Sequence, residues 1–554
     1  MTAETDPSSE YVSPENPRPK PSLKYGWIVL GIALLITVVA QYFAPQFDYQ
    51  NANMIGLASC TLAGAFFLFC LQRRSAWSGH PWRVPIVVVG LGIAAAVCFR
   101  IDGFSGEMIP QIRFRFAQQP RFELKEVSGE PDVLTQIPDG DEAATDIADD
   151  QSPQFLGPNR NGVYDRRRFS IPSSSDEVEV LWNQGIGEGW SSFAVADGQA
   201  ITLEQRDDQE CLTCYRLSDG ELLWVVKHTG YHQHPLGGVG PRSTPTINGR
   251  FVYATTPTGQ LWCVDREDGS VIWEKDLLEL AGWDQPTFES TAPWGYSISP
   301  LLTNGLCIVA LGGPLGLETS ASLIAFSSED GEEVWRNGTD QLSYASPMRM
   351  RLGGVAQVVS VNEASVTGHA ILSGETLWTV DWPGSTNTGA NCAAAMAFGD
   401  NRLVVGKGYG GGSLAIEVTK SEDDWQTQDL WTSSRVLKTK FNHTCVLGNV
   451  GFGISNGLLQ AVELSEANAY WTQPRRSRAA EGHVVLVEDT LLVQDEAGDV
   501  VFVDAETSAY NERLRLEALS SKTWNIPTVA GRHVLVRNDR QAICFRLPAR
   551  SSEN

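Results

Sequence analysis

The sequence predicts an all-β propeller of eight blades, preceded by three transmembrane α-helices. Three long apolar runs within the first hundred residues predict the helices. A short phrase that ends in tryptophan recurs along the rest of the chain and predicts the blades. Between these parts, residues 104–150 are polar, acidic and poor in aromatic side chains, which is typical of a linker.

The apolar runs span residues 25–44, 54–71 and 84–99 and contain almost no charged side chains. Each run is close to the ~20 residues that a helix needs to cross a bilayer. A cleaved signal peptide would explain only the first run, which is long for that role and lacks an A-x-A type cleavage site. We therefore expect residues 25–103 to form a three-helix membrane anchor.

Basic residues beside the runs predict the orientation of this anchor. They are Arg18, Lys20 and Lys24 before the first run, and Arg73, Arg74 and Arg83 between the second and the third. The loop after the first run contains neither Lys nor Arg. By the positive-inside rule, residues 1–24 form a cytoplasmic tail and everything beyond the third span lies in the periplasm. We therefore expect a multi-pass protein of the inner (cytoplasmic) membrane.

The clearest repeat unit is STPTINGRFVYATTPTGQLWCVDREDGSVIWEK, residues 243–275. Its short β-branched and aromatic runs predict four strands, at residues 243–247, 251–255, 260–265 and 271–275. The turns NGR, PTG and EDG each contain a glycine that can adopt a positive φ between two hairpin strands. Four antiparallel strands in one such unit make a propeller blade.

Related phrases set the number of blades. They end at Trp224, Trp273, Trp335, Trp378, Trp431 and Trp471, and a further copy, FVDAETSAYNERLRL, lacks the tryptophan. These phrases predict seven blades between residues 191 and 517, and the last piece of chain supplies only three strands. We expect the upstream strand EVEVLWN, residues 177–183, to complete the eighth blade by pairing with residues 542–547. The propeller domain would then span residues 151–548, with 549–554 as a C-terminal tail.

The repeat A/C-x-D-x-x-D/T-G-x-x-x-W, seen best at residues 263–273, resembles that of the pyrroloquinoline-quinone (PQQ) superfamily of eight-bladed propellers. This superfamily includes quinoprotein alcohol dehydrogenases and the BamB lipoproteins of outer-membrane assembly. Other phrases resemble a membrane-anchored bacterial subgroup of planctomycete type. They are RIDGFSGEMIP (100–110), QFLGPNRNG (154–162), LEQRDDQE (203–210), GGVGPRSTPT (237–246), LKTKFN (437–442) and KTWNIP (522–527).

The resemblance implies two different functions. A quinoprotein dehydrogenase would hold PQQ and Ca²⁺ at the channel mouth, with carboxylate and amide ligands, an Asp base and, in alcohol dehydrogenases, two adjacent cysteines. Neither the ligand cluster nor the cysteine pair can be mapped onto this sequence, although membrane glucose dehydrogenases also lack that pair. BamB-like propellers are instead non-enzymatic platforms.

We therefore expect a non-catalytic scaffold that binds an envelope protein and needs no cofactor. The alternative is a PQQ-dependent membrane dehydrogenase that oxidises alcohols or sugars, and a third interpretation is sensing of a small ligand in the channel. The net charge of −24 and the lack of a basic stripe in the sequence argue against nucleic acid as a partner.

Polar residues before the innermost strands, together with two at the end of a second strand, predict a binding surface at one channel mouth. The candidates are Glu204, Arg206, Arg242, Lys440, Asn442, Lys522, Trp524 and Asn525. A ring of mixed charge, with Trp524 as a stacking surface, would suit a partner or a ligand. Alternatively, the same residues tie neighbouring blades together by ion pairs and hydrogen bonds to strand ends. The sequence predicts no catalytic residue.

Histidines and cysteines give weaker signals. His228, His232 and His234 lie close together, but they have no carboxylate or cysteine partner beside them, so we expect no metal site. Cys211 and Cys214 are three residues apart on a predicted strand, which directs their side chains to opposite faces and excludes a disulfide between them.

Overall fold

The structure is a computed structural model that describes residues 21–117, 123–127, 150–384, 389–422 and 424–550. It divides into two compact units. The first is helical and contains most of the chain up to residue 100. The second contains the propeller, together with the short segments Phe43–Asn51 and Ile101–Ile112.

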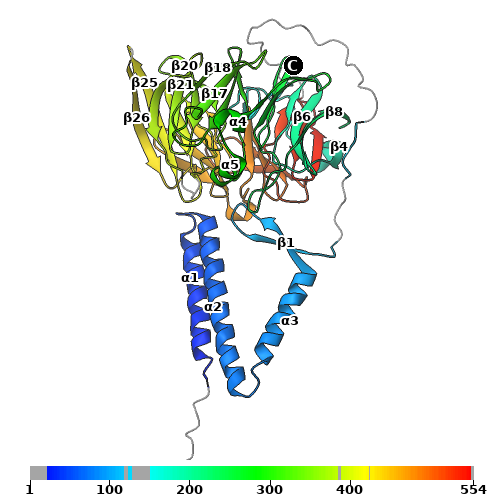
Figure 1. The fold of residues 1–554 in the computed structure, drawn as a ribbon, viewed down its shortest axis with the longest axis vertical. Coiled ribbons are helices and arrows are strands. Elements are labelled where there is room, and N and C mark those ends of the chain that lie inside the picture. Colours follow the sequence, from blue (N-terminus) through cyan, green and yellow to red (C-terminus); the bar gives the residue numbers. More distant parts are fainter. Residues whose placement is uncertain (1–20, 118–122, 128–149, 385–388, 423, 551–554) are drawn as a thin grey trace, which may run out of the picture. The chain divides into compact units, whose positions relative to one another are not determined.

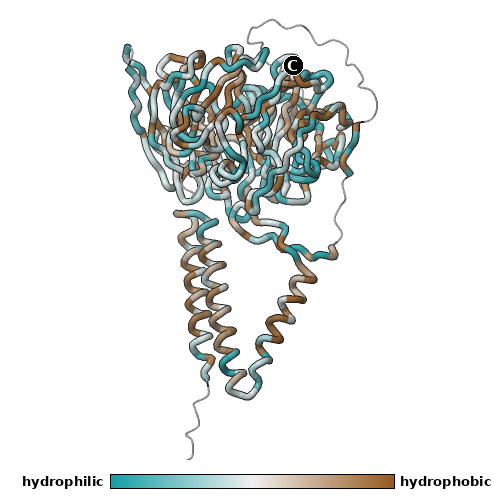
Figure 2. Tube along the Cα trace, viewed as in Figure 1, coloured by the Kyte–Doolittle hydropathy of each residue, from teal (hydrophilic) through white to brown (hydrophobic). Residues whose placement is uncertain are grey.

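The helical unit contains α1 (Lys24–Phe43), α2 (Tyr49–Trp77) and α3 (Arg83–Cys98). All three helices are dominated by apolar residues (Figure 2). In the described part of the chain, α1 and α2 are long and apolar enough to cross a membrane. The third helix has 16 residues, so it is about 24 Å long and shorter than the ~30 Å hydrocarbon core. The prediction of three spans is therefore supported by length for two helices only.

The propeller unit has eight blades, and each contains a four-stranded antiparallel sheet (Figure 1). In blades 1 to 7 the innermost strand comes first in the chain, whereas the outer strand of blade 8 comes from an upstream segment, and blade 7 has one added strand. Blades 1 to 4 are formed by β5 (Ala194–Ala196), β6 (Gln199–Arg206), β7 (Gln209–Arg216) and β8 (Leu222–Thr229); β11 (Thr246–Asn248), β12 (Phe251–Thr255), β13 (Gln260–Asp265) and β14 (Val271–Asp276); β15 (Leu301–Thr303), β16 (Leu306–Gly312), β17 (Ala321–Ser327) and β18 (Glu333–Asn337); and β19 (Met348–Leu352), β20 (Val355–Val361), β21 (Ser365–Ala370) and β22 (Thr376–Asp381).

Blades 5 to 8 continue the same pattern. They are formed by β23 (Met396–Phe398), β24 (Arg402–Gly406), β25 (Ser413–Ser421) and β26 (Asp424–Ser433); β27 (Cys445–Leu447), β28 (Val450–Ser455), β29 (Leu458–Glu463) and β30 (Asn468–Thr472); β31 (His483–Val487), β32 (Thr490–Gln494), β33 (Val500–Asp504) and β34 (Glu512–Leu516); and β35 (Thr528–Ala530), β36 (His533–Arg537), β37 (Gln541–Arg546) and β4 (Glu179–Gly185). The strand β3 (Val163–Tyr164) adds to blade 7 beside β31.

Short elements occupy the connections between some blades. The hairpin of β9 (Gln233–His234) and β10 (Gly238–Val239) lies between blades 1 and 2, and α4 (Leu277–Ala281) and α5 (Gln285–Thr291) lie between blades 2 and 3. The outer strand of blade 8 is the upstream strand β4, which pairs with β37 from Gln541–Gly185 to Arg546–Glu179. The predicted closure of the ring is therefore confirmed, and β4 lies beside the C-terminal strands in Figure 1.

A β-bulge explains the recurring tryptophan. In every blade the third strand has a residue that pairs with the tryptophan position of the fourth strand. The register of these two strands shifts directly after that residue. That facing residue is Cys, Ala or Gly in the seven blades that have the tryptophan. In blade 7, where Leu514 replaces it, the facing residue is the large Phe502. The pair thus keeps its combined volume, as a close-packed core requires.

The tryptophans also join each blade to the next. The indole N–H of Trp224 donates to the Arg266 carbonyl at 2.9 Å, and that of Trp273 donates to the Ser328 carbonyl at 3.2 Å. Gly269, in the turn after Arg266, has φ +76°, and a Cβ there would lie 2.8 Å from the Trp224 ring. Only glycine fits this turn, which explains why the repeat joins an Asp-Gly turn to a tryptophan.

Residues 150–165 fill one end of the central channel. Each blade has four strands that alternate in direction, so the chain leaves a blade at the face where it entered. Every innermost strand therefore begins at the same face of the propeller. We call this face the entry face and the opposite one the exit face. The segment pairs with Val195 and Leu486, near the ends of two innermost strands. Arg160, which is 4% exposed, donates to the carbonyls of Ser299, Pro300 and Pro347. The phrase QFLGPNRNG is therefore a plug that extends from the exit side into the channel.

The predicted linker starts later than the sequence indicated. The strands β1 (Phe99–Phe104) and β2 (Pro110–Phe114) form a hairpin, and Ile101–Ile112 belongs to the propeller unit, with Glu107 only 2% exposed. A few buried contacts hold this polar segment to the propeller, whereas its composition alone is typical of a linker. Most of the remaining predicted linker, 118–122 and 128–149, lies outside the described residues.

Candidate ligand-binding cavity in the propeller channel

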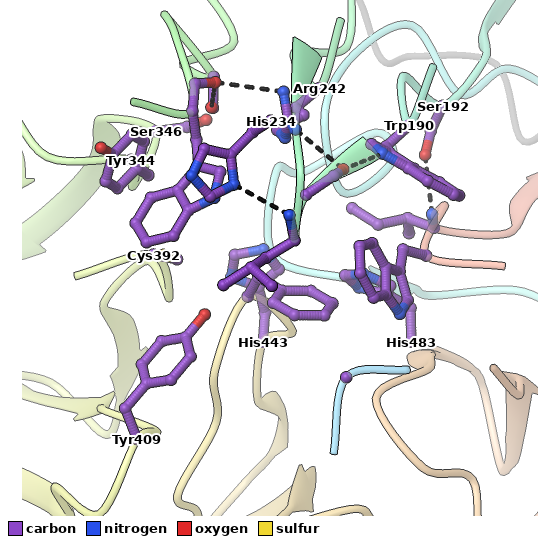
Figure 3. A pocket seen from close by; sticks show the side chains of 18 of the residues that line it. Trp190, Ser192, His234, Arg242, Tyr344, Ser346, Cys392, Tyr409, His443 and His483 are labelled. Atoms are coloured by element: carbon purple, nitrogen blue, oxygen red, sulfur yellow. Dashed lines mark hydrogen bonds between the residues drawn. The ribbon is translucent and has the colours of Figure 1, made fainter. Parts of the chain in front are cut away.

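A cavity of about 450 Å³ lies in the channel at the entry face. The residues that precede the innermost strands supply most of its wall, and Phe155 of the plug contributes to it. Figure 3 shows His234, Arg242, Tyr409, His443 and His483 around this space. Its volume is in the range of small-molecule sites.

The repeat places one residue at the same point before each innermost strand. In blades 1 to 8 these are Trp190, Arg242, Ser297, Tyr344, Cys392, Phe441, Glu481 and Trp524. All of them except Glu481 line the cavity. We call these eight residues the entry ring. The residues two positions later in the chain also reach the cavity in most blades, for example Ser192, His443 and His483.

Aromatic rings form much of the wall, and hydrogen bonds fix their orientation. The indole N–H of Trp190 donates to the Gly237 carbonyl at 2.7 Å, and that of Trp524 donates to Glu496 Oε1 at 2.9 Å. The two rings lie 5.0 Å apart. On another side, Trp294 packs edge-on against Tyr344 at 5.1 Å. Because the indole donors are engaged, the rings offer rigid apolar faces to the cavity.

Arg242 is the cation of the entry ring. It donates to the carbonyls of Gly237, Gly240 and Trp294. In the described part of the chain, no carboxylate lies within ion-pair distance of its guanidinium. Burial lowers its pKa to about 10. The cavity therefore contains a partly desolvated positive charge that only neutral carbonyls stabilise.

The histidines of the cavity are neutral. Burial lowers the pKa of His443 to about 3 and that of His483 to about 4, and burial with the nearby Arg242 lowers the pKa of His234. His443 Nδ1 accepts a hydrogen bond from the Ala394 N–H at 3.1 Å, and His234 Nδ1 accepts from the Trp294 indole at 3.1 Å. In a neutral ring whose Nδ1 is an acceptor, the proton is on Nε2.

The segment Phe43–Asn51 covers part of the entry face. Lys438, which is 4% exposed, donates to the carbonyls of Pro45, Gln46 and Phe47. Asn456 accepts from the Tyr49 N–H and donates to the Ala44 carbonyl. Gln50 reaches the cavity wall.

The segment Ile101–Ile112 covers another part of the entry face. Arg478 forms an ion pair of 2.5 Å with Glu107, and the Gly106 N–H donates to Glu496 at 2.6 Å. Ser105, Gly106 and Met108 line the cavity. We call Phe43–Asn51 and Ile101–Ile112 together the cap.

The predicted site residues fall into three groups. Arg242 and Trp524 line the cavity. Lys440, Asn442, Lys522 and Asn525 flank the entry ring. Glu204 and Arg206 lie within β6 of blade 1.

The flanking residues bond to the cap and to neighbouring blades. Lys440 is 1% exposed, pairs with Glu481 at 2.8 Å and donates to the Gly106 carbonyl at 3.1 Å. Lys522 lies 3.9 Å above the Trp524 ring and donates to the Phe104 carbonyl. Asn442 and Asn525 donate to the carbonyls of Gly482 and Ser191 in the next blade. These contacts match the interpretation in which such residues join parts of the chain.

Glu204 is fully buried inside blade 1. It accepts hydrogen bonds from Thr213 and Tyr215 and pairs with Arg206 at 2.8 Å. Burial alone would raise its pKa, but the nearby Arg206 and Arg537 hold the pKa of this carboxyl below its usual value. The charged pair therefore stabilises the blade away from the cavity.

Sequence reasoning missed most of the aromatic wall. Trp190, Trp294 and Tyr344 lie in irregular connections, where hydrophobic periodicity gives no signal. A usable signal existed nevertheless, because Tyr344, Phe441 and Trp524 occupy the same repeat position as Arg242.

The lining residues do not match the donor set of a calcium–quinone centre. Among the described residues that line the cavity there is no Asp, Glu or Asn, whereas Ca²⁺ requires several such oxygen ligands. In the described part of the chain, no group of three or more His, Cys, Asp or Glu side chains could hold a metal ion. Cys211 and Cys214 are free and buried, three residues apart on β7.

Known proteins share the repeat pattern. The family model described as "Outer membrane protein assembly factor BamB" matches residues 175–311 and 282–429. The resemblance to PQQ-repeat propellers is thus confirmed. The matched residues cover less than half of the chain, and the membrane-anchored subgroup stays a prediction. No curated protein sequence matches the chain.

Similar solved structures include BamB and a quinohemoprotein alcohol dehydrogenase. BamB from Moraxella catarrhalis is 14% identical, with a TM-score of 0.45, and the match covers 68% of this chain and 99% of that protein. The quinohemoprotein alcohol dehydrogenase ADHIIG from Pseudomonas putida HK5 is 12% identical, with a TM-score of 0.43, over 76% and 84% of the two chains. Since both TM-scores are below 0.5, the propeller assignment rests on the strand pairing described above.

Proposed function

We propose that this protein is a membrane-anchored, non-catalytic propeller that acts as a binding scaffold in the periplasm. The observation that carries the proposal is the composition of the cavity wall, which offers aromatic faces, neutral histidines and one arginine. Quinone-dependent oxidation would need a carboxylate base in the wall, and the described residues of the wall include no carboxylate. An assembly role would be shared with the protein named by the matching family model.

Chain connectivity supports the proposed three-span topology. Phe43–Asn51 joins α1 to α2, and Ile101–Ile112 follows α3, yet both segments belong to the propeller unit. Parts of one folded unit lie on the same side of a membrane, so α2 and α3 must either both cross it or both stay out of it. Because α2 has the length and hydropathy of a span, α3 is proposed to cross as well. A local thinning of the bilayer would accommodate its length.

Reporter fusions test this topology. A reporter that is active only in the periplasm, fused after residue 550, should be active, whereas the same reporter after residue 80 should be inactive. With two spans only, the first fusion would also be inactive, and that result would reject the three-span arrangement.

Exposed apolar side chains at the entry face suggest where a partner binds. Leu315 and Leu317 lie in the β16–β17 loop and are 86% and 49% exposed, and Tyr231 and Leu236 lie in the connection after β8. Loops after the second and fourth strands of a blade leave at the same face, because these strands are parallel to each other. Exposed apolar side chains on one face of a propeller are candidate contact points for a protein partner.

Position-specific cross-linking tests the scaffold role. A photoreactive amino acid at Leu315 should give a discrete cross-linked product with one envelope protein in living cells. The matched control is Leu372, which is 70% exposed in the loop between β21 and β22 at the opposite face. Equal products from both positions, or none from Leu315, would contradict the proposal.

Reconstitution tests the enzymatic alternative. The purified full chain, supplied with PQQ and Ca²⁺, is expected to show no dye-linked oxidation of alcohols or sugars. Sustained turnover with either substrate class would replace the scaffold proposal with a dehydrogenase.

A further inference from the structure

The arginine of the cavity lacks a counter-ion within the described chain. Arg242 is held in place by three backbone carbonyls, and the cavity wall beside it has no Asp or Glu among its described residues. A cation in such a setting is stabilised less than in water, and a charge-assisted bond to an anion would recover the loss. The guanidinium is planar, so a carboxylate can accept two parallel hydrogen bonds from it.

The remaining wall selects a flat and largely apolar ligand. Trp190 and Trp524 form one wall, and Trp294 with Tyr344 forms another. Their indole N–H groups already donate to protein atoms, so the rings can contact a ligand only through their surfaces. Stacking against such rigid rings favours aromatic or conjugated ligands.

Hydrogen-bond donors supplement the arginine. The neutral rings of His234 and His443 each accept through Nδ1, which leaves Nε2–H as a donor. Ser192 accepts from the Ile526 N–H, so its own hydroxyl proton is available. The hydrogen-bond donors and the arginine of this wall disfavour a cationic ligand and a metal ion.

We propose that this cavity binds a planar aromatic or conjugated monocarboxylate, with the carboxylate on Arg242 and the ring between Trp190, Trp294 and Trp524. This site differs from a quinone centre, because it uses no metal and only one cation. The proposal does not depend on the scaffold role, since the ligand would occupy the channel whether or not a protein binds the entry face.

Calorimetric titration of the full chain in detergent tests the proposal with 4-hydroxybenzoate as the probe. We expect saturable binding, together with quenching of tryptophan fluorescence. The matched neutral probe is 4-hydroxybenzamide, which keeps the ring and loses the charge. It should bind at least tenfold more weakly, because it cannot form the charge-assisted pair.

Variants of two arginines in the same blade complete the test. Arg242→Met should weaken 4-hydroxybenzoate binding at least tenfold, whereas Arg250→Met, at an exposed arginine that pairs with Asp265, should leave it unchanged. Arg242→Lys keeps the charge but not the planar fork, so its affinity for 4-hydroxybenzoate should lie between those of the other two variants. It replaces Arg242→Met in the test if that variant does not fold. Equal affinities for acid and amide, unchanged affinity in Arg242→Met, or no binding to the folded wild type up to millimolar probe would each overturn the proposal.

Discussion

The two ends of the channel are closed by different physical means. Residues 150–165 close the exit side as the plug, which extends into the channel, where the Arg160 guanidinium donates to three backbone carbonyls in a fully packed site. At the entry side, the cap is held by ion pairs and lysine–carbonyl bonds, and a cavity remains beneath it. Each end thus contains an arginine without a carboxylate partner in the described chain, but only Arg242 faces open space.

This difference separates structural from functional arginines. Burial lowers the pKa of Arg160 to about 9 and that of Arg242 to about 10, so the pKa does not distinguish them. Packing does, because Arg160 is surrounded by protein atoms and Arg242 borders a cavity. A buried polar group therefore indicates a ligand site only when the structure also leaves room for the ligand.

The largest expected effect is at the plug. Arg160→Met should lower the free energy of unfolding by about 4 kcal/mol, because three buried carbonyls lose their donor. Arg242→Met should cost less than about 1 kcal/mol, because water in the cavity can replace its bonds. Chemical unfolding of the full chain, followed by tryptophan fluorescence, measures both values. Similar losses for the two variants would remove the distinction between the channel ends.

The next effect is at the cap. Lys440→Met leaves Glu481 without its partner, and we expect a loss of about 2–3 kcal/mol. The loss is limited because burial already raises the pKa of Glu481 to about 7, so the carboxyl can take up a proton. Hydrogen exchange should accelerate in Ile101–Ile112 and stay unchanged in residues 150–165. A uniform increase over both segments would show that the two ends are not independent.

Acid should weaken the entry side through its histidines. The pKa of His443 is about 3 in the folded chain and about 6.5 when unfolded, so only the unfolded chain gains this proton between these values. The contribution of His443 to stability is therefore nearly complete above about pH 7.5, and it falls as the pH decreases, by about 1.4 kcal/mol per pH unit between about pH 5.5 and 4. The variant His443→Gln should reduce the fall in the free energy of unfolding between pH 6.5 and 5.5 by about 1 kcal/mol. An unchanged slope would mean that His443 is charged in the folded protein.

The smallest expected effect concerns Lys522. Its ammonium lies 3.9 Å from the Trp524 ring centre and 5.2 Å from that of Trp190, and it donates to the Phe104 carbonyl. Lys522→Gln should cost about 0.5–1 kcal/mol, the scale of a partly exposed cation–π contact. Thermal unfolding of the full chain checks this, and a loss as large as that of Lys440→Met would place Lys522 among the main supports of the cap.

The fold could be predicted from the sequence better than the site, because the fold depends on residues close together in the sequence and the site depends on residues far apart in it. The blade signal is local, because the Asp-Gly turn and the tryptophan lie in one hairpin, and even the closing strand carries its own Trp182. The cap could not be predicted, because Lys438 and Lys440 bind backbone carbonyls of distant segments. Every residue has a backbone carbonyl, so the sequence does not show which ones will accept these bonds. Arg242 and Trp524 were found because they lie directly before a recognisable strand, whereas Trp294 lies in an irregular connection.

The order of the strands in blade 8 has a consequence for biosynthesis. The strand β4 leaves the ribosome before any blade exists, but its partner β37 follows roughly 360 residues later. At 5–20 residues per second, β4 waits about 20–70 s with an unpaired edge. Throughout this interval the growing chain has two open sheet edges, which are sites of mispairing between chains. Completion of the C-terminal strands is therefore the step that ends the exposure of this protein to aggregation.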